Sequence, residues 1–172
     1  MEFEIAPGWV FEQGRLNVMI APTDRFITLF NESQNFQRYM TLFISGNFSR
    51  VLSHVDRTVT RFEVRRAFTS FQLKTILEEN YHTVVVFEYD PTLFEGDPRM
   101  KEIIAEALQE VAYNSIVIVY APKTDWILRQ ILRRVKRLFF YGESEEFLPL
   151  CDQKRVKKRD TGRYARQLTL PV

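Results

Sequence analysis

The sequence predicts an α/β protein with a mostly parallel sheet that ends in an antiparallel meander. Three observations support this fold class. Short apolar runs without a helical period occur at 16–20, 41–45, 83–87 and 115–121, as expected of buried parallel strands. The segments between several of these runs carry apolar residues at three- and four-residue spacing, which is typical of amphipathic helices. After residue 138, short strand-like segments alternate with turn residues.

The length and composition indicate one globular domain over residues 1–172. The chain is 45% apolar and has fifteen phenylalanines, which need an interior to pack in. Cys151 is the single cysteine, so no intrachain disulfide is expected, and the first residues do not resemble a signal peptide. Every apolar run is far shorter than the roughly 20 residues needed to cross a bilayer. We therefore expect a cytoplasmic protein without membrane contact.

In the first half of the chain, strands and helices are expected to alternate. The polar cap residue Thr69 begins a helix in which Phe71, Leu73, Ile76 and Leu77 share one face. The expected elements are, in order, an aromatic lead-in at 1–11 that covers one edge of the sheet, a strand at 16–20, a helix at 28–40, a strand at 41–45, a polar loop at 48–59, a half-exposed strand at 61–65 and a helix at 69–80.

The second half shows a clearer period. The β-branched run at 83–87 is typical of a central strand covered on both faces. Apolar residues from Met100 to Val111 recur at helical spacing after the turn signal at 97–98. The expected elements are a strand at 83–87, a helix at 100–111, a strand at 115–121, a helix from 126 to 138 and three strands at 138–141, 147–156 and 163–170.

Several short sequence motifs follow one another in the same order as in the RecA/RadA/KaiC superfamily. The chain therefore resembles the ATPase core of that family. Residues 14–28, GRLNVMIAPTDRFIT, stand where the family has its phosphate-binding loop after a strand. Residues 65–73, RRAFTSFQL, are similar to the run before its Walker B strand, and 84–88, VVVFE, to that strand with its acid, Glu88. The basic run at 154–159 resembles the Lys/Arg hairpin of KaiC- and RadB-like proteins. The resemblance implies a three-layer α/β/α domain.

The phosphate loop departs from the family pattern. Such a loop works because glycines let backbone N–H groups converge on phosphates, a lysine neutralises charge, and a Ser or Thr holds Mg²⁺. Ala21, Phe26 and Ile27 replace the two glycines and the lysine, and Thr28 alone remains. The prediction is a degenerate nucleotide site without catalytic residues, bound cofactor or bound metal, formed by Asp24, Arg25, Thr28 and Glu88.

An acidic group follows the strand at 83–87, where α/β proteins place ligands. It consists of Glu88, Asp90, Glu95 and Asp97. Two interpretations remain open. Carboxylates in this position could hold Mg²⁺ for nuclease chemistry, whereas Asp90-Pro91 and Asp97-Pro98 are also typical of turns and helix caps.

Basic charge is concentrated toward the C-terminus. Residues 123–172 contain 13 Lys or Arg and 6 Asp or Glu, a net charge of +7, which leaves −5 for the rest of a chain whose total is +2. Such segregation is typical of a surface for an anionic partner, and equally of a solvated face. The candidate positions for nucleic-acid or partner binding are Arg99, Lys123, Arg129, Arg133, Lys136, Arg137, Lys154, Arg155, Lys157, Lys158 and Arg159.

These observations lead to one main functional hypothesis and two alternatives. The main hypothesis is a non-hydrolysing RecA-like accessory or scaffold protein that acts with a partner RecA-family ATPase, with DNA, or with both, in recombination or repair. Self-association into a homo-oligomer is a further expectation. The alternatives are a metal-dependent nucleic-acid enzyme that uses Glu88 and Asp90, and an ATPase with an unorthodox phosphate loop.

Overall fold

The computed structural model describes residues 1–6, 9–56, 61–97, 99–133, 137–141, 157–160 and 165–169. Their elements are β1 (Glu2–Ala6), β2 (Trp9–Glu12), β3 (Leu16–Ile20), α1 (Thr23–Glu32), α2 (Gln34–Arg38), β4 (Thr41–Ser45), β5 (Phe62–Arg66), α3 (Ser70–Glu78), β6 (Val84–Glu88), the 3₁₀ turn η1 (Pro91–Phe94), α4 (Met100–Asn114), β7 (Ile116–Ala121), α5 (Trp126–Leu132), β8 (Arg137–Tyr141), β9 (Lys157–Asp160) and β10 (Ala165–Thr169).

The main sheet has eight strands in the order β5-β4-β6-β7-β3-β8-β10-β9. The strands from β5 to β8 run parallel, and β10 and β9 extend the sheet antiparallel. The mostly parallel sheet with an antiparallel extension is therefore confirmed. Strand β10, and not β9, is the partner of β8. The strand expected at 147–156 lies outside the described residues.

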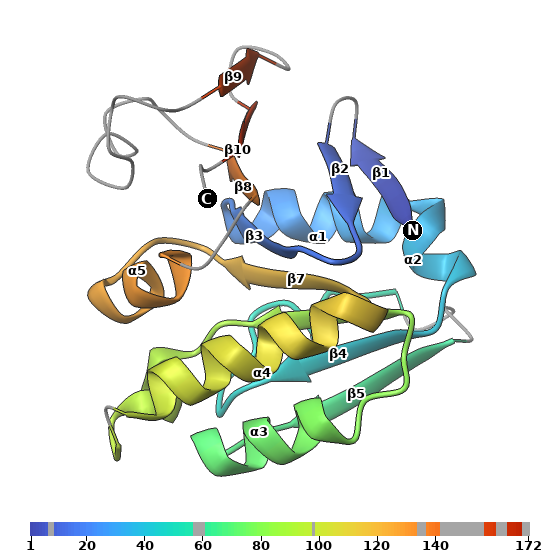
Figure 1. The fold of residues 1–172 in the computed structure, drawn as a ribbon. Coiled ribbons are helices and arrows are strands. Elements are labelled where there is room, and N and C mark those ends of the chain that lie inside the picture. Colours follow the sequence, from blue (N-terminus) through green and yellow to red (C-terminus); the bar gives the residue numbers. More distant parts are fainter. Residues whose placement is uncertain are drawn as a thin grey trace.

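Helices and a hairpin cover the two faces of the sheet and make three layers (Figure 1). Helices α3, α4 and α5 pack on one face, against alternate strand residues such as Val18, Ile44 and Val85. Helices α1 and α2 and the β1–β2 hairpin pack on the other face, against the neighbouring residues such as Met19 and Phe43. This alternation follows from the two-residue period of a strand, and it explains why the central strands are apolar throughout.

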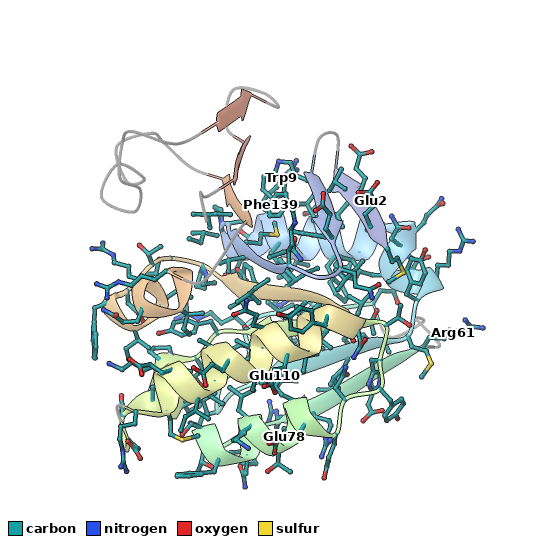
Figure 2. All side chains as sticks on the ribbon, viewed as in Figure 1. Glu2, Trp9, Arg61, Glu78, Glu110 and Phe139 are labelled. Atoms are coloured by element: carbon teal, nitrogen blue, oxygen red, sulfur yellow. The ribbon has the colours of Figure 1, made fainter. Side chains whose placement is uncertain are left out.

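The N-terminal hairpin covers a face of the sheet, which corrects the expectation that it covers an edge. Trp9 and Phe11 pack around Phe139 of β8, with ring centroids 5.5 Å and 4.5 Å apart (Figure 2). The fully buried Asn17 of β3 ties the hairpin to the sheet, because its side chain bonds both the N–H and the carbonyl of Glu12. A face buries these large rings more completely than an edge would.

Helix α3 confirms the expected helix and its cap, since the Thr69 side chain accepts a hydrogen bond from the Gln72 N–H. Phe71 does not share the buried face as predicted, because its side chain is 62% exposed. At 3.6 residues per turn, position 71 lies about 140° around the helix from position 76. Within the described residues, no helix has the length and apolar character needed to span a bilayer.

Candidate functional site at the carboxyl ends of the strands

The junction between β3 and α1 occupies the place predicted for a phosphate loop. Helix α1 begins at Thr23, so only Ala21 and Pro22 separate it from the strand. The N–H of Phe26 already donates to the Pro22 carbonyl at 3.0 Å, as in a regular first helical turn. The expected helix start at residue 28 is therefore wrong by five residues. A connection of two residues is too short to form a loop around an anion.

Two aromatic rings fill the space beside this junction. Phe26 of α1 and Tyr120 of β7 are each 1% exposed and stack with ring centroids 3.8 Å apart. The Tyr120 hydroxyl lies 3.2 Å from the Ala21 carbonyl oxygen and 3.3 Å from Thr23 Oγ1. Burial raises the pKa of Tyr120 to about 12, so the hydroxyl stays protonated at neutral pH. The position of Tyr120 was missed by the sequence reasoning, because a buried strand tyrosine has no local signature.

Two of the residues predicted for the nucleotide site, Asp24 and Glu88, lie close enough to Tyr120 for their negative charges to raise the pKa of its hydroxyl. Asp24 and Arg25 are exposed on the first turn of α1. Thr28 Oγ1 donates to the Asp24 carbonyl at 2.9 Å, a bond within the helix that occupies the hydroxyl. Glu88 lies at the end of β6, with β7 between it and β3. Asp24 and Glu88 therefore approach Tyr120 from two different elements, whereas the Thr28 hydroxyl is bonded within α1.

Glu88 holds the turn that follows β4. Its carboxylate accepts hydrogen bonds from the Ser49 hydroxyl and, at 3.0 Å, from the Arg50 N–H. Ser49 Oγ in turn accepts from the Leu52 N–H at 3.0 Å. Glu88 is 6% exposed, and burial raises the pKa of its carboxyl, although these hydrogen bonds oppose the change.

Asp90 anchors the start of the turn that follows β4. One carboxylate oxygen accepts from the Asn47 N–H at 2.9 Å, and the other accepts from the N–H and hydroxyl of Thr92 at 3.0 Å and 2.7 Å. Gly46 allows this approach, because a Cβ there would lie 2.5 Å from Asp90 Cβ. The side-chain cap of η1 confirms the structural interpretation of Asp90-Pro91.

The acidic group does not assemble a metal centre within the part of the chain that the structure describes. Asp97 pairs instead with Arg99, one of the predicted partner-binding cations, with the guanidinium 3.0 Å from a carboxylate oxygen. The hydrogen bonds from Arg99 lower the pKa of the Asp97 carboxyl. This pair is exposed, so its contribution to stability is small.

The predicted basic stripe on the helix after β7 is shorter than expected. Helix α5 ends at Leu132, and Arg137 and Leu138 lie in β8. Arg129 and Arg133 are exposed at the end of α5, and Lys123 is exposed after β7. The basic hairpin is confirmed as an element, because Lys157, Lys158 and Arg159 lie in β9, which pairs with β10. Lys136, Lys154 and Arg155 lie outside the described residues.

The buried carboxyl of Glu88 gives a testable pH dependence. Because its pKa is raised in the folded state, the folded protein holds this proton more tightly than the unfolded chain. Its stabilising contribution is present below the unfolded pKa and is lost as the pH rises through the folded pKa. Glu88→Gln removes this dependence, so the unfolding free energy of the variant minus that of the wild type should increase with pH above about pH 4, with a slope of at most about 1.4 kcal/mol per pH unit.

Urea unfolding followed by tryptophan fluorescence measures this difference. Groups that titrate in the same way in the variant and the wild type cancel in this difference of unfolding free energies. Glu110→Gln, at an exposed position on α4, serves as the control, because it removes a carboxyl that is not buried. If the free-energy difference between Glu88→Gln and the wild type stayed flat or fell with pH, burial would not be disfavouring the ionised carboxylate of Glu88.

Comparisons with known proteins place the fold. No protein-family model matches the chain. An uncharacterized protein of Archaeoglobus fulgidus is 29% identical over 163 residues, which cover 92% of this chain and 83% of that protein. The crystal structure of the RadB recombinase superposes with a TM-score of 0.53 at 16% identity, over 75% of this chain and 74% of that one.

A second solved structure is similar over a larger share of the chain. The DNA-packaging ATPase B204 of Sulfolobus Turreted Icosahedral Virus superposes with a TM-score of 0.50 at 13% identity, over 81% of this chain and 82% of that one. At these identities the similarity concerns the fold. It shows that the chain shares an α/β fold with these two structures.

Proposed function

We propose that this chain is a RecA-like accessory or scaffold protein that has lost the phosphate loop, does not hydrolyse nucleotide, and acts in the cytoplasm with a partner ATPase, DNA or both in recombination or repair. The packed junction between β3 and α1 carries the proposal. There, Phe26 and Tyr120 fill the space beside a helix that begins at Thr23. The fold similarity to a recombinase and a DNA-packaging ATPase supports the choice of partners.

The two alternative functions receive less support from the site. A nuclease centre would need carboxylates free to bind Mg²⁺. Those of Glu88 and Asp90 instead accept hydrogen bonds from the segment after β4. An ATPase with an unorthodox loop would need converging donors near the end of β3. Only Ala21 and Pro22 connect β3 to α1, which leaves no loop to carry such donors around a phosphate chain.

Nucleotide binding is the first test. A ligand that binds the folded state at 100 times its Kd stabilises it by about 2.7 kcal/mol. For a domain of this size that would raise the melting temperature by about 5 to 10 °C. We expect the melting temperature of the wild type to change by less than about 1 °C in millimolar ATP with Mg²⁺. A RecA-family ATPase measured in parallel serves as the positive control, and a clear rise for this chain would refute the proposed loss of the nucleotide site.

DNA binding is the second test. Contacts from Lys or Arg to phosphates release counterions, so affinity for single-stranded DNA should fall with salt, independently of sequence. Replacing Lys157, Lys158 and Arg159 by glutamine should weaken binding and reduce the slope of log K against log salt by about 2. Lys74→Gln, on α3 beneath the other end of the sheet, should change neither. No binding by the wild type at low salt would remove DNA from the proposal and leave the partner ATPase.

A further inference from the structure

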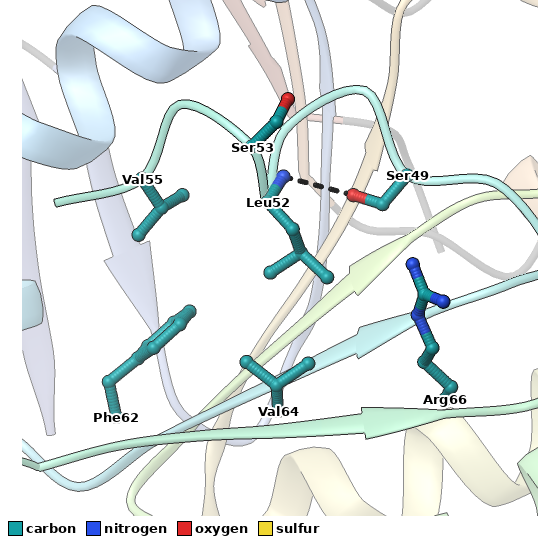
Figure 3. A pocket seen from close by; sticks show the side chains of 7 residues that line it. All are labelled: Ser49, Leu52, Ser53, Val55, Phe62, Val64 and Arg66. Atoms are coloured by element: carbon teal, nitrogen blue, oxygen red, sulfur yellow. Dashed lines mark hydrogen bonds between the residues drawn. The ribbon is translucent and has the colours of Figure 1, made fainter. Parts of the chain in front are cut away.

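A pocket of about 570 Å³ opens between the edge strand β5 and the turn that Glu88 holds (Figure 3). Its volume falls in the range of small-molecule sites. Phe62 and Val64 of β5 form one wall, and Leu52 and Val55 of the turn form the opposite wall. The pocket lies on the sheet face that carries α1, and its lining residues do not include those of the junction between β3 and α1.

The pocket is apolar at one end and cationic at the other. Phe62, Val64 and Arg66 point to the same side because alternate strand residues share a face. In Figure 3, Phe62 lies opposite Val55 at one end, and the Arg66 guanidinium lies across from Ser49 at the other. Four residues of extended strand separate the two ends, a distance of about 13 Å.

The charge of Arg66 is left uncompensated in the described part of the chain. Its neighbour Arg65 points to the other face and pairs with Glu79 at 2.8 Å, whereas the exposed side chain of Arg66 makes no hydrogen bond or ion pair with the described residues. The carboxylate of Glu88 is already bonded to Ser49 and to the Arg50 N–H. An arginine that faces an apolar pocket without a partner is suited to a carboxylate, which its planar fork binds through two parallel hydrogen bonds.

We propose that this pocket binds a small carboxylic acid with an apolar chain or ring. The carboxylate pairs with Arg66, and the apolar body lies along Val64 toward Phe62 and Val55. Burial of the body supplies most of the affinity, and the ion pair fixes the orientation. This inference concerns a different surface from the proposed function and does not depend on it.

Octanoate is a suitable probe, with neutral 1-octanol and short acetate for comparison. Each is titrated into the full chain, and the Kd is measured from amide chemical shifts of β5 and the turn. Octanoate should bind at least about tenfold more tightly than octanol or acetate. Arg66→Gln should raise the Kd of octanoate by about tenfold or more and leave the Kd of octanol unchanged. Arg65→Gln, on the same strand but the opposite face, should change the Kd of octanoate by less than about twofold.

A steric variant tests the apolar end. Val64 is 42% exposed and lies in a strand, so Val64→Phe should fold, and its ring would occupy the pocket and abolish binding of both octanoate and octanol. The proposal is overturned if Arg66→Gln binds octanoate as tightly as the wild type, or if octanol matches octanoate. It is also overturned if octanoate at about 10 mM does not shift the pocket amides of the folded wild type.

Discussion

Replacing Phe26 with alanine is expected to lower the unfolding free energy by about 3 to 5 kcal/mol, the cost of emptying a fully buried phenylalanine site. Phe26 is 1% exposed, stacks on Tyr120 at 3.8 Å and lies 5.9 Å from the ring of Phe30. Neighbouring backbone on both sides belongs to regular elements, which limits how far the site can collapse. The melting temperature should fall by about 6 to 20 °C.

Thermal and urea unfolding measure this effect, and two matched variants separate its causes. Phe71→Ala removes the same atoms from a side chain that is 62% exposed, so it should change stability by less than about 0.5 kcal/mol. Tyr120→Phe keeps the stacked ring and removes only the hydroxyl contacts, at a cost of about 1 kcal/mol. If Phe26→Ala and Phe71→Ala had similar effects, the junction would not be a packed core element.

The same variant also bears on function. Opening a cavity does not lengthen the two-residue connection between β3 and α1 into a phosphate-binding loop. We therefore expect that Phe26→Ala, like the wild type, is not stabilised by ATP with Mg²⁺. Stabilisation of Phe26→Ala alone would instead mean that the aromatic ring is what blocks an otherwise competent nucleotide site.

Gly46→Ala is expected to lower the unfolding free energy by about 1 to 3 kcal/mol, the usual cost of overpacking. The reason is space, because the backbone of Gly46 does not require a positive φ. An added Cβ would lie 2.5 Å from Asp90 Cβ and 2.7 Å from its Cγ, so the Asp90 side chain must move. That movement also breaks the bond to the Asn47 N–H, which anchors the turn after β4.

A double-mutant cycle with Asp90→Gly tests this cause. Asp90→Gly removes the atoms that the new Cβ would meet, so Gly46→Ala should cost less than about 1 kcal/mol in that background. The coupling free energy should then be about 1 to 2 kcal/mol. Urea unfolding of the four proteins gives its value. Additive costs would show that Gly46 is required for a reason other than the approach of Asp90.

Local patterns predicted the central sheet well and its junctions poorly. The run at 83–87 indicated a buried central strand, and β6 confirms it with all five residues buried. The predicted helix start at residue 28 was wrong. The prediction assumed a loop after β3, whereas the first turn of α1 begins there, at Thr23. The helix after β7 was extended too far because Leu138 continues a helical period by chance, although it lies in β8.

The candidate site shows the same division. Its acidic residues were visible in the sequence as a group after a strand, and the turn interpretation of Asp90-Pro91 is confirmed by the cap of η1. Their hydrogen-bond partners were not visible. Asn47 and Ser49 lie about 40 positions away in the chain, and they meet the carboxylates only because β4 and β6 are neighbours in the sheet.

Local sequence was sufficient to predict the fold class and to show that no glycine lies between β3 and β4, because strand burial and loop composition are local properties. What occupies the place of that loop depends on the tertiary structure. Tyr120 lies 99 positions from Ala21 in the chain, and parallel pairing of β3 with β7 brings its hydroxyl to the Ala21 carbonyl. Contacts of this kind depend on strand order, which places segments that are distant in the chain side by side in the sheet.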